Sequence, residues 1–267
     1  MLSKIIFAAM MLEYKNININ YTNSGEGSTI VLLHGFLETV GMWSDLVPKL
    51  SKKHRVVCID LLGHGETGCI GYVHTMEAMA DAVLAVLNHL EIKKAHIIGH
   101  SMGGYVALAL AENQPQLIKS LCLMNSTFEA DDNQRKALRV RANDMAKTNF
   151  KSLVSMSFAN LFAPESRLKF KNELDDALLI ALQTSVQGYI AASEGMRLRS
   201  NYFEVLKRLD SHKLIIVGTK DWIINIEKLK SQIINTDIKC EEFSEGHMSH
   251  IENKSELSYT INQFIEK

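Results

Sequence analysis

The feature that most constrains the fold of this chain is a series of short, continuous apolar runs separated by helical patterns. Thr29–Leu33 is rich in β-branched and leucine residues, as expected for a strand buried on both faces. Similar runs recur at 56–59, 95–98, 120–124 and 214–217. Apolar residues spaced three or four apart predict helices over 76–90 and 255–265, and the apolar segment 102–112 predicts a buried helix. This alternation predicts an α/β fold with a mostly parallel sheet covered by helices on both faces.

The two ends of the chain are less regular. Segments 12–14 and 17–21 predict short strands followed by a turn at 23–27, and 238–243 predicts a weaker edge strand. Lys4 and the apolar segment after it resemble a short secretory signal, although one Lys and the lack of an A-x-A-like cleavage site speak against it. Residues 1–9 are therefore interpreted as a signal, a disordered start or a wrongly assigned start.

One long segment breaks the alternation of strands and helices. From 126 to 210 the pattern is helical, so we expect a core of 12–125 and 211–267 with 126–210 inserted as a helical cap. In this cap Met156, Phe158 and Phe162 are interpreted either as an apolar pocket lining or as ordinary core. A basic stretch has two interpretations, a solvated helix face or a source of one Arg that binds a substrate carboxylate. Its members are Arg135, Lys136, Arg139 and Arg141.

Composition excludes several classes of protein. The formal net charge is -1, so no basic field is available to hold nucleic acid or an anionic membrane surface. With 46% hydrophobic residues the chain is too apolar to be disordered, yet no apolar run approaches the length of a membrane span. The scattered cysteines lack a C-x-x-C pair, which predicts small buried side chains, no zinc site and a cytoplasmic location. They are Cys58, Cys69, Cys122 and Cys240.

A G-x-S-x-G pattern at 99–103 carries the strongest chemical signal. It follows the buried run 95–98 and opens the helix predicted from Met102. A strand, a sharp turn and a helix are what a nucleophile elbow requires, because the serine must project from a strained turn while glycines admit the neighbouring backbone. We therefore predict that Ser101 is a catalytic nucleophile.

A serine nucleophile needs a base and an orienting acid, and the chain supplies both in the order Ser, acid, His. Asp221 follows the strand 214–217, and His247 follows the last predicted strand. Both positions lie at the carboxyl edge of the sheet, where ligands collect in open α/β folds. His250 competes as the base, but Gly246 favours a tight loop that presents His247. A metal site is not expected, because these two His have no nearby third ligand in the sequence.

The turn after Leu33 predicts an oxyanion site. His34-Gly35-Phe36 follows a strand, and the backbone N–H groups of Phe36 and Met102 are the expected donors. Substrate contacts are expected from four neighbours of these residues. They are His34, Gly35, His100 and Trp222.

Together these motifs resemble the α/β-hydrolase fold superfamily over residues 12–266. They are His34-Gly35-Phe36, the segment 60–65, Gly99-His100-Ser101-Met102-Gly103, 218–221 and Gly246-His247. The resemblance implies an eight-stranded, mostly parallel sheet with a helical cap. It is greatest to small esterases, lactonases and carbon–carbon bond hydrolases, since haloalkane dehalogenases and epoxide hydrolases have Asp where this chain has Ser101.

We therefore expect a serine hydrolase that acts on a carboxylic ester or related acyl bond of a small, partly apolar molecule. The alternative is a lyase or C–C bond hydrolase with the same triad, similar to SHCHC synthase, although Gly104-Tyr105 replaces the usual basic residue. A non-catalytic receptor on this fold would have a broken triad. No cofactor is expected, because the G-x-G-x-x-G match at 63–68 does not open a helix. The sequence does not determine the oligomeric state.

Overall fold

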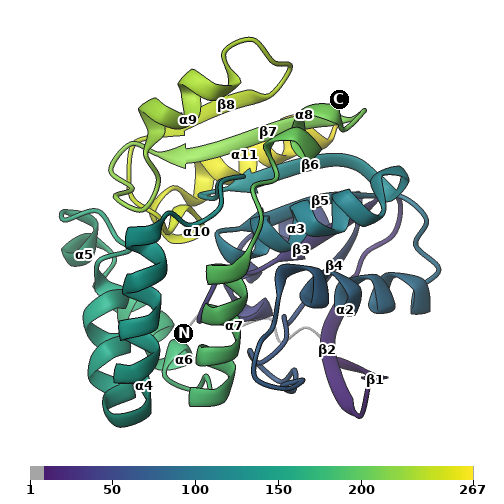
Figure 1. The fold of residues 1–267 in the computed structure, drawn as a ribbon. Coiled ribbons are helices and arrows are strands. Elements are labelled where there is room, and N and C mark those ends of the chain that lie inside the picture. Colours follow the sequence, from purple (N-terminus) through teal and green to yellow (C-terminus); the bar gives the residue numbers. More distant parts are fainter. Residues whose placement is uncertain (1–8, 267) are drawn as a thin grey trace.

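The computed structural model describes residues 9–266, so the expectations for residues 1–8 lie outside the described residues. Its centre is a single eight-stranded sheet with the order β1-β2-β4-β3-β5-β6-β7-β8 (Figure 1). The first two strands join antiparallel to their neighbours, and all the later pairs are parallel. The predicted fold class is thereby confirmed. The strands are β1 (Met10–Tyr14), β2 (Ile17–Ser24), β3 (Thr29–Leu33), β4 (Arg55–Ile59), β5 (Ala95–His100), β6 (Ile118–Met124), β7 (His212–Gly218) and β8 (Lys239–Phe243).

Helices lie on both faces of this sheet. The 3-10 helices are η1 (Val40–Trp43) and η2 (Pro115–Leu117). The α-helices are α1 (Val47–Leu50), α2 (Met76–His89), α3 (Met102–Asn113), α4 (Asn133–Ala159), α5 (Ser166–Lys169), α6 (Lys171–Ala181), α7 (Val186–Leu198), α8 (Phe203–Arg208), α9 (Ile226–Ile233), α10 (Ser249–Glu252) and α11 (Lys254–Ile265). The three long helices predicted from apolar spacing correspond to α2, α3 and α11, each within one residue at both ends.

Alternate residues of the buried strands face two different cores. In β3, Ile30 and Leu32 pack with η1, α1 and α11, whereas Val31 and Leu33 pack with α2 and α3. Because side chains alternate across a strand, a strand covered on both faces must be apolar at every position. This explains why the continuous runs identified the central strands.

The predicted turn at 23–27 begins two residues later than expected. Asn23 and Ser24 pair with Val57 and Val56 of β4, so β2 continues through them. The Arg55 side chain donates a 3.0 Å hydrogen bond to Asn23 Oδ1. These partners come from a strand far along the chain, and they outweigh the local preference of Asn and Ser for turns.

Helices α4, α6 and α7 group together at one side of the sheet (Figure 1). Their apolar residues form a third core with Leu37 and Met248 of the loops at the sheet edge and with Ile251 of α10. Of the predicted lining residues, Phe158 and Phe162 are buried here, whereas Met156 is 71% exposed and contributes to neither core nor lining. The boundaries of the cap at 126 and 210 stay a prediction. Leu206 of α8 lies within the predicted cap but packs in the same core cluster as residues of α3.

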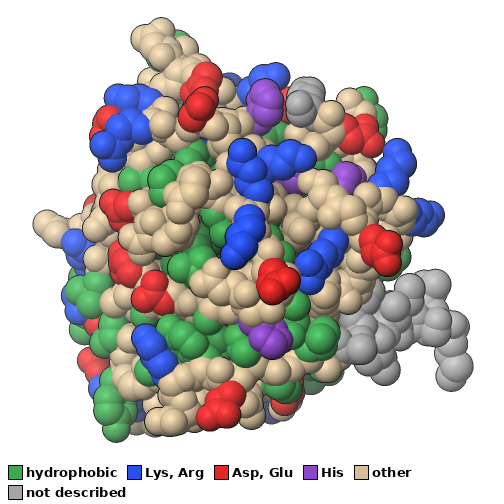
Figure 2. Space-filling view, turned by 90° about the vertical axis from the view of Figure 1, so that its right-hand side faces the viewer, with side chains coloured by type: hydrophobic (Ala, Val, Ile, Leu, Met, Phe, Trp, Pro, Cys, Tyr) green, Lys and Arg blue, Asp and Glu red, His purple; other side chains and the backbone are tan. Residues whose placement is uncertain are grey.

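The expectation of four buried cysteines is correct for Cys58 and Cys122 only. Cys69 and Cys240 are partly exposed, because they lie in a loop and on the edge strand β8. Within residues 9–266, no helix combines the length and the apolar composition needed to cross a membrane. On the face shown in Figure 2, Lys and Arg side chains lie among Asp and Glu side chains.

Candidate active site

Ser101 occupies the sharp turn between β5 and α3. Its backbone has φ 48° and ψ -112°, a left-handed conformation that non-glycine residues rarely adopt. The Ser101 N–H donates to the carbonyl of Met124 at 2.9 Å, which anchors the turn to β6. A Cβ at Gly99 would lie 2.3 Å from the Gly103 carbonyl oxygen, and a Cβ at Gly103 would lie 2.3 Å from that of Leu33. Both glycines are therefore required for the close packing of this turn.

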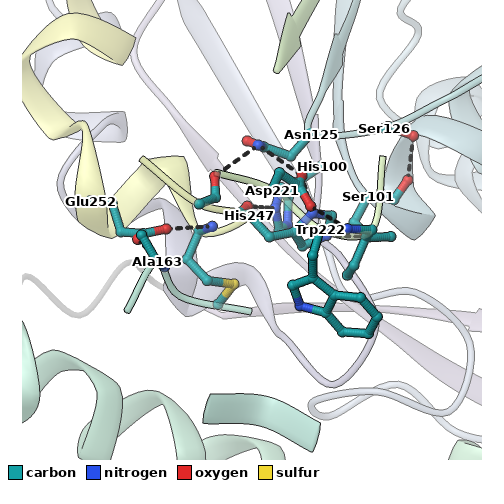
Figure 3. Close-up of polar contacts among 12 residues, drawn as sticks. His100, Ser101, Asn125, Ser126, Ala163, Asp221, Trp222, His247 and Glu252 are labelled. Atoms are coloured by element: carbon teal, nitrogen blue, oxygen red, sulfur yellow. Dashed lines mark hydrogen bonds and ion pairs between the residues drawn. The ribbon is translucent and has the colours of Figure 1, made fainter. Parts of the chain in front are cut away.

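Three side chains from separate loops form one hydrogen-bonded row (Figure 3). The Ser101 hydroxyl donates to Nε2 of His247 at 2.9 Å. On the other side of the ring, Nδ1 of His247 donates to Oδ2 of Asp221 at 2.6 Å. The imidazole thus has its free acceptor directed at the serine, which is the tautomer that a general base requires.

Asp221 is buried in a well-satisfied environment. Its Oδ1 accepts the Ile223 N–H at 2.9 Å, and the Asn125 amide lies 3.4 Å from Oδ2. Burial alone would raise the pKa of the Asp221 carboxyl. The opposite influences are larger, so its pKa is lowered: they are the charge and hydrogen bond from His247 and the hydrogen bonds from Ile223 and Asn125. The side chain therefore remains a carboxylate that can stabilise an imidazolium.

Of the two predicted oxyanion donors, Met102 follows Ser101 in the chain and Phe36 lines the same cavity as Ser101. Met102 is the first residue of α3, where helical geometry leaves backbone N–H groups without an intrahelical acceptor. Neither Phe36 nor Met102 donates its N–H to a backbone or side-chain acceptor among residues 9–266. The donors are therefore available to an oxygen bound beside the serine.

The four predicted substrate contacts divide into two pairs. His100 and Trp222 line the same cavity as Ser101. The Trp222 indole N–H also donates to the Asn160 carbonyl at the end of α4, at 2.5 Å. The structure does not bring His34 and Gly35 into this lining: His34 is fully buried, and its Nε2 accepts the Leu61 N–H at 2.9 Å. Its role in this geometry is to hold the turn after β3 against the turn after β4.

The cavity beside Ser101 has a volume of about 220 Å³. This volume lies below the range of roughly 300–1,000 Å³ that is usual for ligand pockets, so it suits a small molecule. Most of its lining is apolar or aromatic and comes from both the sheet-edge loops and the cap helices. The apolar and aromatic members are Phe36, Leu37, Tyr105, Phe158, Leu161, Tyr189, Met196, Trp222, Ile223 and Met248.

Glu38 was not identified from the sequence, although it connects several parts of the site. Its Oε2 accepts the Gly35 N–H at 2.7 Å and contacts Nδ1 of His100 at 2.6 Å. On the other side of that ring, Nε2 of His100 donates to the His247 carbonyl at 2.9 Å. Both ring nitrogens of His100 therefore act as donors, which requires an imidazolium.

The pKa values of this pair agree with an ion pair. Burial opposes charge on both groups, but the mutual attraction raises the pKa of His100 and lowers the pKa of Glu38 to about 2. The only sequence signal was an acidic residue three positions after Gly35, close to the predicted oxyanion turn.

The predicted competitor His250 is also buried, with Nε2 3.6 Å from Oε1 of Glu38. Among the described residues, Glu38, His100 and His250 bring one ligand atom each within 4.8 Å of one another. The 2.6 Å contact between Glu38 and His100 is a hydrogen-bond length, whereas two ligands on one tetrahedral zinc lie about 3.3 Å apart. In this arrangement the cluster suits a shared proton better than a metal ion.

Comparisons with known proteins identify the family. A sequence profile described as the alpha/beta hydrolase fold matches residues 28–254, so the chain belongs to the α/β-hydrolase fold family. The prediction from the motifs is thereby confirmed, and with it the prediction of a hydrolase at the level of the family.

The individual proteins that this chain is similar to share only about a quarter to a third of its residues. The chain is 27% identical to 3-oxoadipate enol-lactonase 1 of Acinetobacter baylyi, over 94% of each chain. It is 31% identical to a dihydrolipoyllysine-residue acetyltransferase component of the acetoin cleaving system of Pseudomonas putida, over 91% of this chain but only 65% of that protein. Among solved structures, a thermophilic esterase from Thermogutta terrifontis superposes with a TM-score of 0.89 at 25% identity, over 97% of this chain and 98% of that one.

Proposed function

We propose that the protein is a serine hydrolase that cleaves a carboxylic ester or a related acyl bond of a small, partly apolar molecule. The observation that carries this proposal is the hydrogen-bonded row of Ser101, His247 and Asp221, with contacts of 2.9 and 2.6 Å. A row of hydroxyl, imidazole and carboxylate with this tautomer activates a serine toward carbonyl carbon.

In the proposed mechanism, Ser101 attacks the carbonyl carbon as His247 takes its proton. The N–H groups of Phe36 and Met102 bind the oxyanion, and Asp221 stabilises the imidazolium. His247 then protonates the leaving alkoxide as the carbon–oxygen bond breaks, which leaves an acyl group on Ser101. A water molecule, deprotonated by His247, attacks the carbonyl carbon of this acyl group. The bond from that carbon to Ser101 Oγ then breaks, His247 returns the proton to Oγ, and the carboxylic acid leaves.

The type of bond is supported by the cavity and by the relatives. A small, largely apolar cavity next to Ser101 suits a short acyl chain or a lactone ring. The names of two similar proteins, an enol-lactonase and an esterase, refer to carboxylic ester bonds.

For the whole protein we keep a cytoplasmic location as a prediction, on the basis of its scattered cysteines.

The test is hydrolysis of p-nitrophenyl acetate and butyrate, followed through release of nitrophenolate. The wild type should turn over both esters, and Ser101→Ala should lose activity by at least about 10⁴-fold. Thr127→Ala is a matched control, since it removes another buried hydroxyl near the same sheet edge that has no place in the row. A Ser101→Ala protein that remains as active as the parent would exclude the proposal.

The lyase or C–C hydrolase alternative makes a different prediction. Those reactions use the same base without a lasting acyl-enzyme. Rapid acid quench of the wild type with a p-nitrophenyl ester, followed by mass spectrometry, should find the acyl mass on the peptide that carries Ser101. A labelled serine with a fluorophosphonate but no trapped acyl group would favour the alternative.

A further inference from the structure

Arg139 is the charged side chain that enters the cavity from the cap. It lies on α4 and lines the same cavity as Ser101 and His247. Its Nε donates to Oδ2 of Asp131 at 2.5 Å, and its side chain remains 21% exposed. Its two terminal Nη groups donate to no acceptor among residues 9–266. The guanidinium is thus held in place at one edge, while its other edge is free to bind a ligand.

The carboxylate that holds Arg139 is shared with a second guanidinium. Nη1 of Arg199 lies 2.8 Å from Oδ1 of Asp131, and both of these side chains are buried. Arg199 also lies over the ring of Tyr105, with its guanidinium carbon 4.0 Å from the ring centre. Burial would raise the pKa of Asp131, but the two guanidiniums lower it, so the group is charged. Two cations around one anion leave one positive charge in excess at this wall of the cavity.

A second donor lies near Arg139. Tyr189 of α7 lines the cavity, and its hydroxyl has no hydrogen-bond partner within the described chain. Burial raises the pKa of Tyr189 despite the nearby Arg139 charge, so the hydroxyl keeps its proton and can donate it in a hydrogen bond. The Arg139 Nη groups and the Tyr189 hydroxyl are not among the buried polar atoms that lack a partner, so these donors are open to the cavity and can meet an acceptor that binds there.

We propose that the substrate carries a carboxylate that binds the free edge of Arg139, with the Tyr189 hydroxyl as an additional donor. This inference rests on the proposed function and specifies its substrate class as a small ester or lactone with an anionic group. Guanidinium and carboxylate are planar and form paired charge-assisted bonds, which are stronger in a partly dry site. The apolar side chains that line the same cavity then contact the carbon chain that joins the two ends of the substrate.

The kinetic test compares two esters that differ by one methyl group and one charge. They are the mono-p-nitrophenyl ester of glutaric acid, which is an anion, and its methyl ester, which is neutral. The quantity measured is the ratio of their kcat/KM values at pH 7.5, because a ratio does not depend on the amount of folded enzyme. The wild type should prefer the anion, and Arg139→Gln should lower the ratio about 10- to 100-fold. Arg141→Gln, on an exposed position of the same helix, should leave the ratio unchanged.

A binding test separates this inference from the proposed function. In the Ser101→Ala background, isothermal titration calorimetry with monomethyl glutarate should detect binding that Arg139→Gln abolishes, whereas dimethyl glutarate should not distinguish the two proteins. Equal ratios in wild type and Arg139→Gln, or glutarate monoester binding that is independent of Arg139, would overturn the inference even if both esters are hydrolysed. Arg139-dependent binding without any ester hydrolysis would support the carboxylate site and contradict the proposed function.

Discussion

Glu38 and His100 form a buried ion pair with 2.6 Å between Oε2 and Nδ1, and the other ring nitrogen of His100 contacts the backbone of His247. The pair joins three backbone segments of the site. Glu38 accepts the Gly35 N–H of the oxyanion turn, and His100 precedes Ser101 and donates to the carbonyl of His247. Loss of the proton from His100, or protonation of Glu38, would therefore disturb the oxyanion turn, the proposed nucleophile Ser101 and the proposed base His247 together.

Glu38→Gln should reduce kcat/KM about 10- to 100-fold, with most of the loss in kcat, because small misplacements of reacting groups are costly. Without the carboxylate, His100 loses its counter-charge and becomes neutral, so only one of its two nitrogens can donate. Steady-state kinetics with p-nitrophenyl butyrate measure the effect, and Glu241→Gln on the exposed face of β8 is the control. An unchanged kcat in Glu38→Gln would contradict a positioning role.

The same pair predicts how stability depends on pH. Glu38 has its pKa lowered from 4.5 to about 2, so its contribution is present above pH 4.5 and is lost as the pH falls toward 2. His100 has its pKa raised from 6.5, so its contribution is complete below pH 6.5 and is lost as the pH rises through the raised value. The Tm difference between wild type and Glu38→Gln should therefore be largest between pH 4.5 and 6.5 and should shrink in stronger acid and in base. A Tm difference between the two proteins that kept growing up to about pH 10 would contradict the ion pair, because His100 would by then have lost its proton.

Asp221→Asn should lower kcat about 10⁴-fold while the fold is retained. An amide can donate to Nδ1 of His247, and this favours the tautomer whose Nε2 carries the proton and cannot accept from Ser101. The measurement is kcat for p-nitrophenyl butyrate, with circular dichroism to verify folding. Asp210→Asn, at an exposed position outside the site, provides the matched control. A loss smaller than tenfold would show that Asp221 does not orient the base.

Gly103→Ala should destabilise the protein by more than about 4 kcal/mol. The new methyl group would lie 2.3 Å from the backbone oxygen of Leu33, and neither element can move without disturbing the sheet. At this chain length the loss corresponds to a fall in Tm of about 10 °C or more. In Gly41→Ala the nearest neighbour is the Thr39 hydroxyl at 3.2 Å, so its Tm should change little. Equal melting of both variants would refute this account of the turn.

Local patterns in the sequence predicted the parts of the site that depend on neighbouring residues. The strand, glycine and helix around Ser101 are adjacent in the chain, so one short segment contains the whole signal. Asp221 and His247 were placed by a similar rule, because each follows a strand of a parallel sheet and therefore reaches the same edge.

Contacts between distant segments left no such signal. The hydrogen bond between Glu38 and His100 joins residues 62 positions apart, and the one between Glu252 and Ala163 joins residues 89 positions apart. No local sequence pattern indicates that such distant residues lie side by side. The same limitation affected His34, which was expected near the substrate but binds the Leu61 N–H from the next turn. Packing of the cap likewise buries Phe158 and exposes Met156, although both are apolar residues of the same helix.

Glu252→Gln should loosen the connection between the cap and the His247 loop. The Glu252 carboxylate accepts the Ala163 N–H with one oxygen and the Met248 N–H with the other, both at 2.9 Å (Figure 3). The His247 N–H also donates to the Leu161 carbonyl at 2.8 Å, so the same turn of the cap holds the proposed base.

Glutamine has one acceptor oxygen, so one of the two N–H groups would face an NH₂ group, at a cost of about 1–3 kcal/mol. The expected result is a Tm lower by about 2–10 °C together with a several-fold lower kcat. Glu266→Gln is the control, because it removes only an exposed pair with Lys53, which contributes little. A lower Tm with unchanged kcat would show that Glu252 supports the fold without positioning His247.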